Sequence, residues 1–147
     1  MNISEFNFNN NTPIYLQIAK YFQAKVFIGE LSPGDVIPSR RELAGEARVN
    51  LNTVQKAYSF MEEIGLIKTE KNRFSAITDN KNVIEELRNE FIKEPLENFI
   101  LTMKSVNITK EQVLGLIDRE FDNINEASET EEEKEKDGKS GKSEKAD

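Results

Sequence analysis

The chain has 147 residues, of which 37% are hydrophobic and 32% are charged, and it contains no cysteine and no histidine. Without cysteine there are no disulfide bonds or thiolate metal sites, and without histidine the commonest general base is missing. We therefore expect that the protein is not an enzyme and that it binds no metal and no other cofactor. No apolar run approaches the roughly 18 residues that a membrane span needs, so we expect a cytoplasmic protein without a membrane partner.

The net charge of −7 is unevenly distributed along the chain. Residues 1–80 carry nine basic and nine acidic side chains, whereas residues 81–125 have a net charge of −3 and residues 126–147 a net charge of −4. Within the neutral part, Arg40, Arg41, Arg48 and Lys56 have only two acidic residues among them. The pattern predicts a local basic surface in the first half of the chain.

The first predicted element is a helix over residues 12–28. Thr12 is a suitable N-cap, Pro13 suits the first helical position, and Gly29 ends the segment. Apolar residues at helical spacing predict one buried face: Ile14, Ile18, Tyr21, Phe22 and Val26. The adjacent proline and glycine in residues 31–35 then predict a turn.

Two further helices follow, separated by a break at residues 48–50. Ser39 and Glu42 form a predicted capping box at the start of the first of them. The second is predicted over residues 51–64, and Gly65 ends it. The side chains predicted to face the core from this second helix are Val54, Ala57, Tyr58 and Met61.

The remaining segments are a hairpin, two helices and a tail. Residues 67–69 and 75–77 alternate in polarity around a basic tip, which predicts two strands. A long helical pattern follows, with a kink or break expected just before Pro95. Thr109 and Gln112 form a capping box for a last helix. Residues 126–147 have almost no apolar side chains, so we expect them to be disordered.

The order helix, turn, helix and hairpin predicts a winged helix-turn-helix over residues 1–78. The fold class is therefore mainly α with a small β-hairpin, followed by a C-terminal helical dimerisation hairpin over residues 79–125 and an acidic tail over residues 126–147. In such a fold the second helix of the pair enters the major groove of DNA with its amino end.

Polar and basic side chains gather where this fold would meet DNA. Asn and Gln can hydrogen-bond base edges, Thr can bond bases or phosphates, and arginines at a helix start can meet a phosphate. The predicted DNA-binding residues are Ser39, Arg40, Arg41, Asn50, Asn52, Thr53, Gln55, Lys56, Lys71 and Arg73. Taken singly, these residues are more simply explained as helix caps and solvated surface, and only their combined order favours DNA.

An apolar face runs along the predicted C-terminal helices. Its members are Ile84, Leu87, Phe91, Leu96, Phe99, Ile100 and Met103. This face exceeds what two short helices can hide from water, so we expect a homodimer contact combined with packing onto the first domain. The alternative is packing within one subunit. Two helices cannot enclose a pocket of roughly 300 Å³, so a small-molecule effector stays unknown.

Two stretches resemble the signature of GntR-family regulators. They are residues 29–44, GELSPGDVIPSRRELA, and residues 49–58, VNLNTVQKAY, with EEIGLI at residues 62–67. The resemblance covers residues 12–78, and residues 52–58 together with the short C-terminal region are similar to the YtrA-like branch. It implies a bacterial transcriptional repressor that binds a palindromic double-stranded DNA operator as a homodimer.

The resemblance also assigns roles to individual residues. It places Arg41 on the family's phosphate-contacting arginine, and Asn50, Asn52, Thr53 and Gln55 on positions that touch DNA. Three residues depart from the family pattern. Leu51 stands where relatives carry a base-reading arginine, and Asn72 and Phe74 stand where relatives have glycine in the wing.

The departures in the wing leave minor-groove insertion by Lys71 or Arg73 open. A second class of function therefore also stays open, namely a winged-helix protein-interaction module that does not bind DNA. The neutral charge of residues 1–80 supports this alternative.

Overall fold

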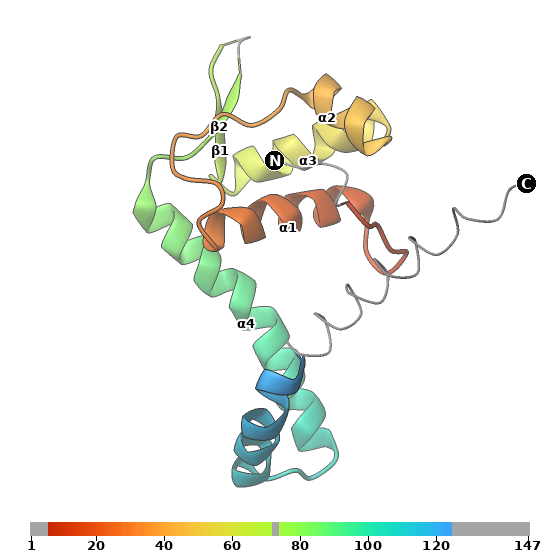
Figure 1. Cartoon of the computed structure of the whole chain (residues 1–147), viewed down its shortest axis with the longest axis vertical. Helices are drawn as coiled ribbons and strands as arrows, with labels where there is room; N and C mark the ends of the chain where they lie inside the picture. The colour runs from red at the N-terminus through yellow and green to blue at the C-terminus, as the bar shows by residue number, and fades with distance from the viewer. Residues whose placement is uncertain (1–5, 72–73, 125–147) are drawn as a thin grey trace, which may run out of the picture. The chain divides into compact units, whose positions relative to one another are not determined.

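The computed structural model describes residues 6–71 and 74–124. The elements in chain order are α1 (Ile14–Phe27), α2 (Arg40–Ala47), α3 (Leu51–Glu63), β1 (Ile67–Thr69), β2 (Ser75–Ile77), α4 (Lys81–Ser105) and a helix over residues 110–124 (Figure 1). The predicted fold class, mainly α with a small β-hairpin and with helices after it, is confirmed. Arg73, Asn72 and the predicted disordered tail over residues 126–147 lie outside the described residues.

The chain divides into two compact units, with the boundary between Pro95 and Leu96. We call the described residues up to 95 the N-terminal unit and residues 96–124 the C-terminal unit. The division places residues 79–95 with the N-terminal unit, whereas the sequence predicted a boundary after residue 78. Within the described ranges, no helix combines the length and the apolar character that crossing a membrane requires.

The core of the N-terminal unit lies between α1 and α3, which run side by side, and α2 packs against α3 (Figure 1). The buried residues of these three helices are Ile18, Ala19, Phe22, Val26, Leu43, Val54, Ala57, Tyr58 and Met61. All four residues predicted to face inward from α3 have no exposed surface. The helical period of the apolar residues therefore gave the correct buried face of α3.

The start of α1 differs from the prediction. Thr12 is not its N-cap, because the helix begins at Ile14 and Pro13 holds the N-cap position with an extended ψ of 139°. The side chain of Gln17 explains the shift: its Nε2 donates to the carbonyl oxygens of Thr12, at 2.7 Å, and Asn9, at 2.9 Å. These bonds hold the preceding segment against the first turn, so the chain enters the helix one residue later than expected.

The turn between α2 and α3 is built as the sequence predicted, with one addition. Ser39 Oγ accepts from the Glu42 amide at 3.1 Å, and Asn50 Oδ1 accepts from the Asn52 amide at 2.8 Å. Both helix starts are thus capped by side chains. The addition is Arg48, which ends α2 in the left-handed conformation with φ 55°. Gly65 ends α3 with φ 84°, in the left-handed conformation that its position requires.

The hairpin has the predicted strands and a neighbour that the sequence did not reveal. β1 and β2 are antiparallel, and the register ends at the pair Thr69 and Ser75, next to the tip. The segment before α2 joins β2 on its other side, since the Ile37 amide donates to Ser75 O at 2.9 Å and the Ile77 amide donates to Asp35 O at 2.8 Å. The predicted turn at residues 31–35 therefore leads into a short edge segment.

Of the predicted kink or break before Pro95, the break does not occur, because α4 continues through this residue. Proline removes one backbone hydrogen bond inside a helix and its ring crowds the carbonyl four residues earlier. Strong helix formers, chiefly Glu, Lys and Leu, flank Pro95 on both sides, and this propensity supports the helix on either side of the defect. The capping box of the last helix is confirmed, with Thr109 Oγ1 and Gln112 Oε1 accepting from each other's amides at 3.3 and 3.0 Å.

Candidate nucleic-acid interface

The amino end of α3 presents a polar edge to solvent. We call Asn50, Asn52, Thr53 and Gln55 the polar edge. Asn50, Asn52 and Gln55 are exposed and Thr53 is half-buried, while Val54, on the opposite side of the same turn, is fully buried. The polar edge is therefore held by a rigid apolar face, as the insertion of a helix into the major groove requires.

Two further exposed cations lie on the helix pair that carries the polar edge. Arg41 lies in the first turn of α2 and is exposed, next to the exposed cap Ser39. Arg48 lies in the turn between the helices and is also exposed. Its place in the basic cluster was visible in the sequence, but it was not predicted as a site residue. A cation in the break of a helix pair, two residues before a polar cap, is the signal that could have identified it.

Lys56 is exposed but is not directed freely into solvent. Its Nζ lies 4.3 Å from the centre of the Tyr15 ring, and this ring meets Phe60 edge-on at 6.1 Å. A cation above an aromatic face is attracted by the electron density of the ring. Lys56 therefore lies between α3 and α1, with its charge held close to the helix surface.

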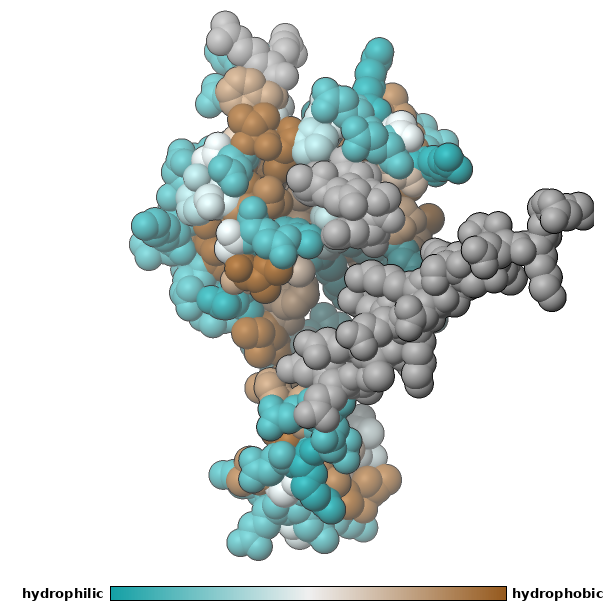
Figure 2. Space-filling view, in the orientation of Figure 1, coloured by the Kyte–Doolittle hydropathy of each residue, from teal (hydrophilic) through white to brown (hydrophobic). Residues whose placement is uncertain are grey.

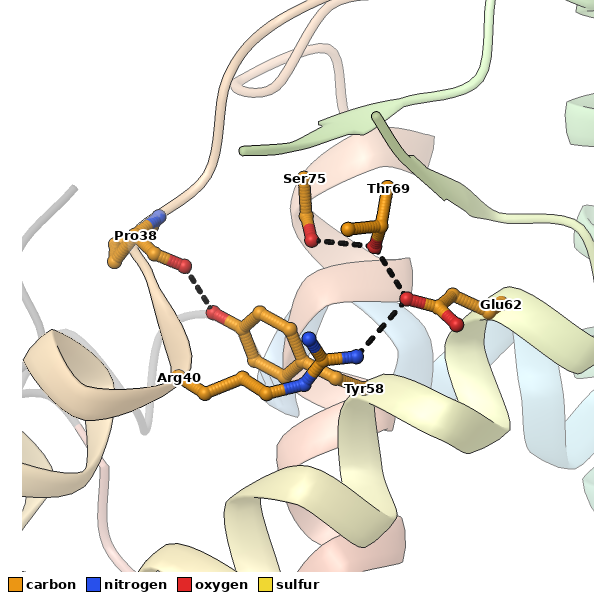
Figure 3. Close-up of polar contacts among 6 residues, drawn as sticks. All are labelled: Pro38, Arg40, Tyr58, Glu62, Thr69 and Ser75. Atoms are coloured by element: carbon orange, nitrogen blue, oxygen red, sulfur yellow. Dashed lines mark hydrogen bonds and ion pairs between the residues drawn. The ribbon is translucent and has the colours of Figure 1, made fainter. Parts of the chain in front are cut away.

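Arg40 differs from its neighbour Arg41 because its described contacts are internal. Figure 3 shows its guanidinium between the Tyr58 ring and the carboxylate of Glu62. Arg40 Nη2 lies 3.0 Å from Glu62 Oε1, and the guanidinium carbon lies 5.3 Å from the centre of the Tyr58 ring. The two arginines predicted to meet phosphates are thus in different environments, and only Arg41 is exposed.

The wing is described only in part. Lys71 is exposed at the tip, and Phe74, just before β2, is 45% exposed. The predicted contact by Arg73 lies outside the described residues. The base of the wing is well defined, since Ile67 and Ile77 face each other in the register and each is 2% exposed.

Tyr58 connects α3 to the segment before α2. Its hydroxyl donates to the Pro38 carbonyl oxygen at 2.5 Å (Figure 3). Burial raises the pKa of the Tyr58 hydroxyl well above its usual value, although the nearby charge of Arg40 acts in the opposite direction. The hydroxyl therefore stays protonated and remains a donor in the folded chain.

Replacing Tyr58 by phenylalanine is expected to lower the free energy of unfolding at neutral pH by about 1–3 kcal/mol, because the Pro38 carbonyl loses its donor. Above a pH of about 10 the unfolded chain loses the tyrosine proton while the folded chain keeps it, so the wild type loses stability as the pH rises. The difference between the two proteins should then shrink by at most about 1.4 kcal/mol per pH unit. Urea unfolding of both proteins between neutral pH and pH about 11 measures this, and a difference independent of pH would contradict it.

The predicted dimer face divides between the two units. Ile84 and Leu87 pack against the core of the N-terminal unit. The Phe91 ring meets Phe27 of α1 at 5.3 Å, and Arg88 Nη2 donates to Phe27 O at 3.2 Å. The first half of α4 therefore packs against α1. For Ile84, Leu87 and Phe91 the structure favours packing within the subunit.

The C-terminal unit leaves its apolar side chains in contact with water. None of residues 96–124 is buried. Its exposed large apolar residues are Leu96, Phe99, Ile100, Leu101, Val106, Leu114, Ile117, Phe121 and Ile124. In Figure 2, hydrophobic atoms lie open on the visible face of these helices. Three of the seven residues predicted for the dimer face are in this group, and a fourth, Met103, is half-buried.

The comparison with known proteins decides the family. A family described as "Bacterial regulatory proteins, gntR family" matches residues 14–74. The HTH-type transcriptional regulator YhcF of Bacillus subtilis is 39% identical over 107 residues, which are 73% of this chain and 88% of YhcF. The chain belongs to the GntR family. The HTH-type transcriptional repressor YtrA of the same organism is 36% identical over 105 residues, which are 71% of this chain and 81% of YtrA.

A solved GntR-family structure extends the similarity beyond the winged helix. A GntR family transcriptional regulator from Listeria monocytogenes has a TM-score of 0.73 and 36% sequence identity, and the match covers 76% of this chain and 98% of that chain. The predicted family and its YtrA-like relatives are thus confirmed. As a GntR-family protein, the chain is a DNA-binding transcriptional regulator, and every predicted DNA-binding residue lies within the matched residues 14–74.

Proposed function

We propose that this GntR-family protein is a repressor that binds a palindromic operator as a homodimer. The observation that carries the proposal is the polar edge of α3, which is exposed while the residue behind it, Val54, is fully buried. A helix end of this kind can enter the major groove without rearranging the core that holds it.

The contacts fall into two groups. Asn52 and Gln55 are exposed amides that can donate to and accept from one base, most favourably adenine, so we assign them to base reading. Arg41 lies at the amino end of α2, where its charge and the free amides of the helix both attract a phosphate. The other proposed contacts are Ser39, Asn50, Thr53 and Lys56, with Lys71 and Arg73 from the wing.

Two copies are needed for tight binding. Residues 1–80 carry no net charge, so one module gains little general attraction to DNA. Joining two modules raises the affinity through effective concentration, provided that both reach the same duplex. The exposed residues Leu96, Phe99 and Ile100 of the predicted dimer face supply a surface for a second copy of the chain.

Selection of binding sites from random duplex DNA by the full chain tests the proposal. We expect an inverted repeat whose half-sites are about one helical turn apart, and an affinity that falls steeply with salt. Inserting about five base pairs between the half-sites places them on opposite faces of the duplex and should reduce the affinity to that of one half-site. Recovery of no repeat would favour a protein-interaction module, which the neutral N-terminal half also allows.

A further inference from the structure

We propose that Arg40 is a positioning residue which, through Glu62, fixes the wing against the helix-turn-helix, and that it does not contact a phosphate. This inference rests on the DNA-binding function proposed above. It departs from the assignment that the sequence suggested, in which Arg40 and Arg41 both meet the DNA backbone.

A continuous chain of polar contacts connects three elements. Arg40, the first residue of α2, pairs through Nη2 with Glu62 Oε1 at 3.0 Å. The same oxygen accepts from the hydroxyl of Thr69, at the end of β1, and Thr69 Oγ1 lies 2.8 Å from Ser75 Oγ, at the start of β2. Because the Thr69 hydrogen points to Glu62, the Ser75 hydroxyl donates to Thr69. Figure 3 shows the whole chain of contacts.

The position of this chain determines what it can control. Thr69 and Ser75 are the last pair in the register of the hairpin before the tip, and Ser75 is 5% exposed. The angle at which the tip leaves the domain is therefore set at this pair. Glu62 accepts from it on one side and from the first turn of α2 on the other, so one carboxylate holds both parts of the proposed interface.

The surroundings of Arg40 favour this internal role. Its guanidinium lies against the buried Tyr58 ring, which limits its orientation. The side chains of Arg40 and Glu62 are 32% and 34% exposed, so water screens part of their attraction and losing it should change overall stability little. Losing the ion pair should instead change the orientation of the wing, and the affinity for DNA measures that change.

Removing the charge of Glu62 distinguishes between the two alternative roles of Arg40, phosphate contact and positioning residue. If Arg40 meets a phosphate, Glu62 competes with DNA for it, so Glu62→Gln frees the arginine and tightens binding. If Arg40 is a positioning residue, the neutral amide oxygen of Glu62→Gln accepts more weakly from Arg40 and Thr69, so the wing is held less firmly and binding weakens, although the variant is less negative. The adjacent Glu63→Gln is the matched control, because Glu63 is exposed and the change in charge is the same.

The experiment measures the affinity of the full chain for its selected operator over a series of salt concentrations. We expect Arg40→Gln and Glu62→Gln each to weaken binding on the order of tenfold. The slope of log affinity against log salt should stay that of the wild type, and the double variant should bind no more weakly than either single variant. Glu63→Gln should bind at least as well as the wild type. Tighter binding by Glu62→Gln, with a slope smaller by about 0.9 in Arg40→Gln, would instead make Arg40 a phosphate contact.

A second measurement does not depend on DNA. Hydrogen exchange of the backbone amides of the wing should be faster in Arg40→Gln and in Thr69→Val than in the wild type, with thermal unfolding close to that of the wild type. Unchanged exchange would overturn the positioning role even if the wild type binds its operator. If the wild type selects no operator while exchange responds as expected, the proposed function fails and the mechanical link between Arg40 and the wing remains.

Discussion

The double substitution Leu96→Glu with Ile100→Glu is expected to produce a monomer whose affinity for the palindromic operator is lower by at least about a hundredfold. The two residues lie four positions apart on one face of α4 and are 51% and 40% exposed. Two carboxylates on this face would be placed in the proposed dimer contact without partners, and they would be strongly unfavourable there. Sedimentation at several protein concentrations gives the oligomeric state, and operator titration gives the affinity.

Leu101→Glu is the matched control for this experiment. Leu101 is 64% exposed, more than either substituted residue, but helical spacing places it on a different face of α4. The control variant should remain a dimer and should bind as the wild type does. If the double variant is still a dimer, the face predicted from the sequence is not the contact between the two copies.

Substitutions at the two groups of proposed DNA contacts should have different signatures. Arg41→Gln should weaken binding to the operator and to random DNA alike and should reduce the salt slope by about 0.9. Asn52→Ala and Gln55→Ala should each cost about 1–3 kcal/mol on the operator, with little effect on random DNA. Titrations of both DNAs over a salt series measure these differences.

Lys93→Gln is the charge control for Arg41→Gln, since Lys93 is an exposed cation on α4, distant in sequence from α2 and α3. It should leave the salt slope close to that of the wild type. If the Arg41, Asn52 and Gln55 variants all bind both DNAs as the wild type does, α2 and α3 do not form the interface.

Local signals gave most of the N-terminal unit correctly. The caps Ser39 and Asn50 and the terminal Gly65 act within a few residues of their own position, so the limits of α2 and α3 could be predicted closely. Contacts over longer distances could not be predicted. Gln17 moves the start of α1 by bonding to Asn9, eight residues earlier. The segment before α2 pairs with β2, about forty residues later, and its sequence has no strand pattern.

The same distinction holds for the candidate site. The polar edge faces outward because the buried apolar residues of α3 recur with helical spacing on the opposite side, and this spacing can be read from the sequence. The partner of Arg40 is 22 residues away, and nothing in the sequence around either residue indicates the pair. The apolar face of α4 was predicted as a whole, but its division between Phe91, which meets α1, and Leu96, which is exposed, depends on tertiary packing.

The absence of any buried side chain in residues 96–124 affects how the proposed repressor responds to its own abundance. Helices that cover no core are stabilised mainly by a partner, so under the proposed dimer their folding is linked to association. Operator occupancy would then rise more steeply than in proportion to the number of molecules in the cell. A given fractional change in synthesis or degradation would then change repression by a larger fraction.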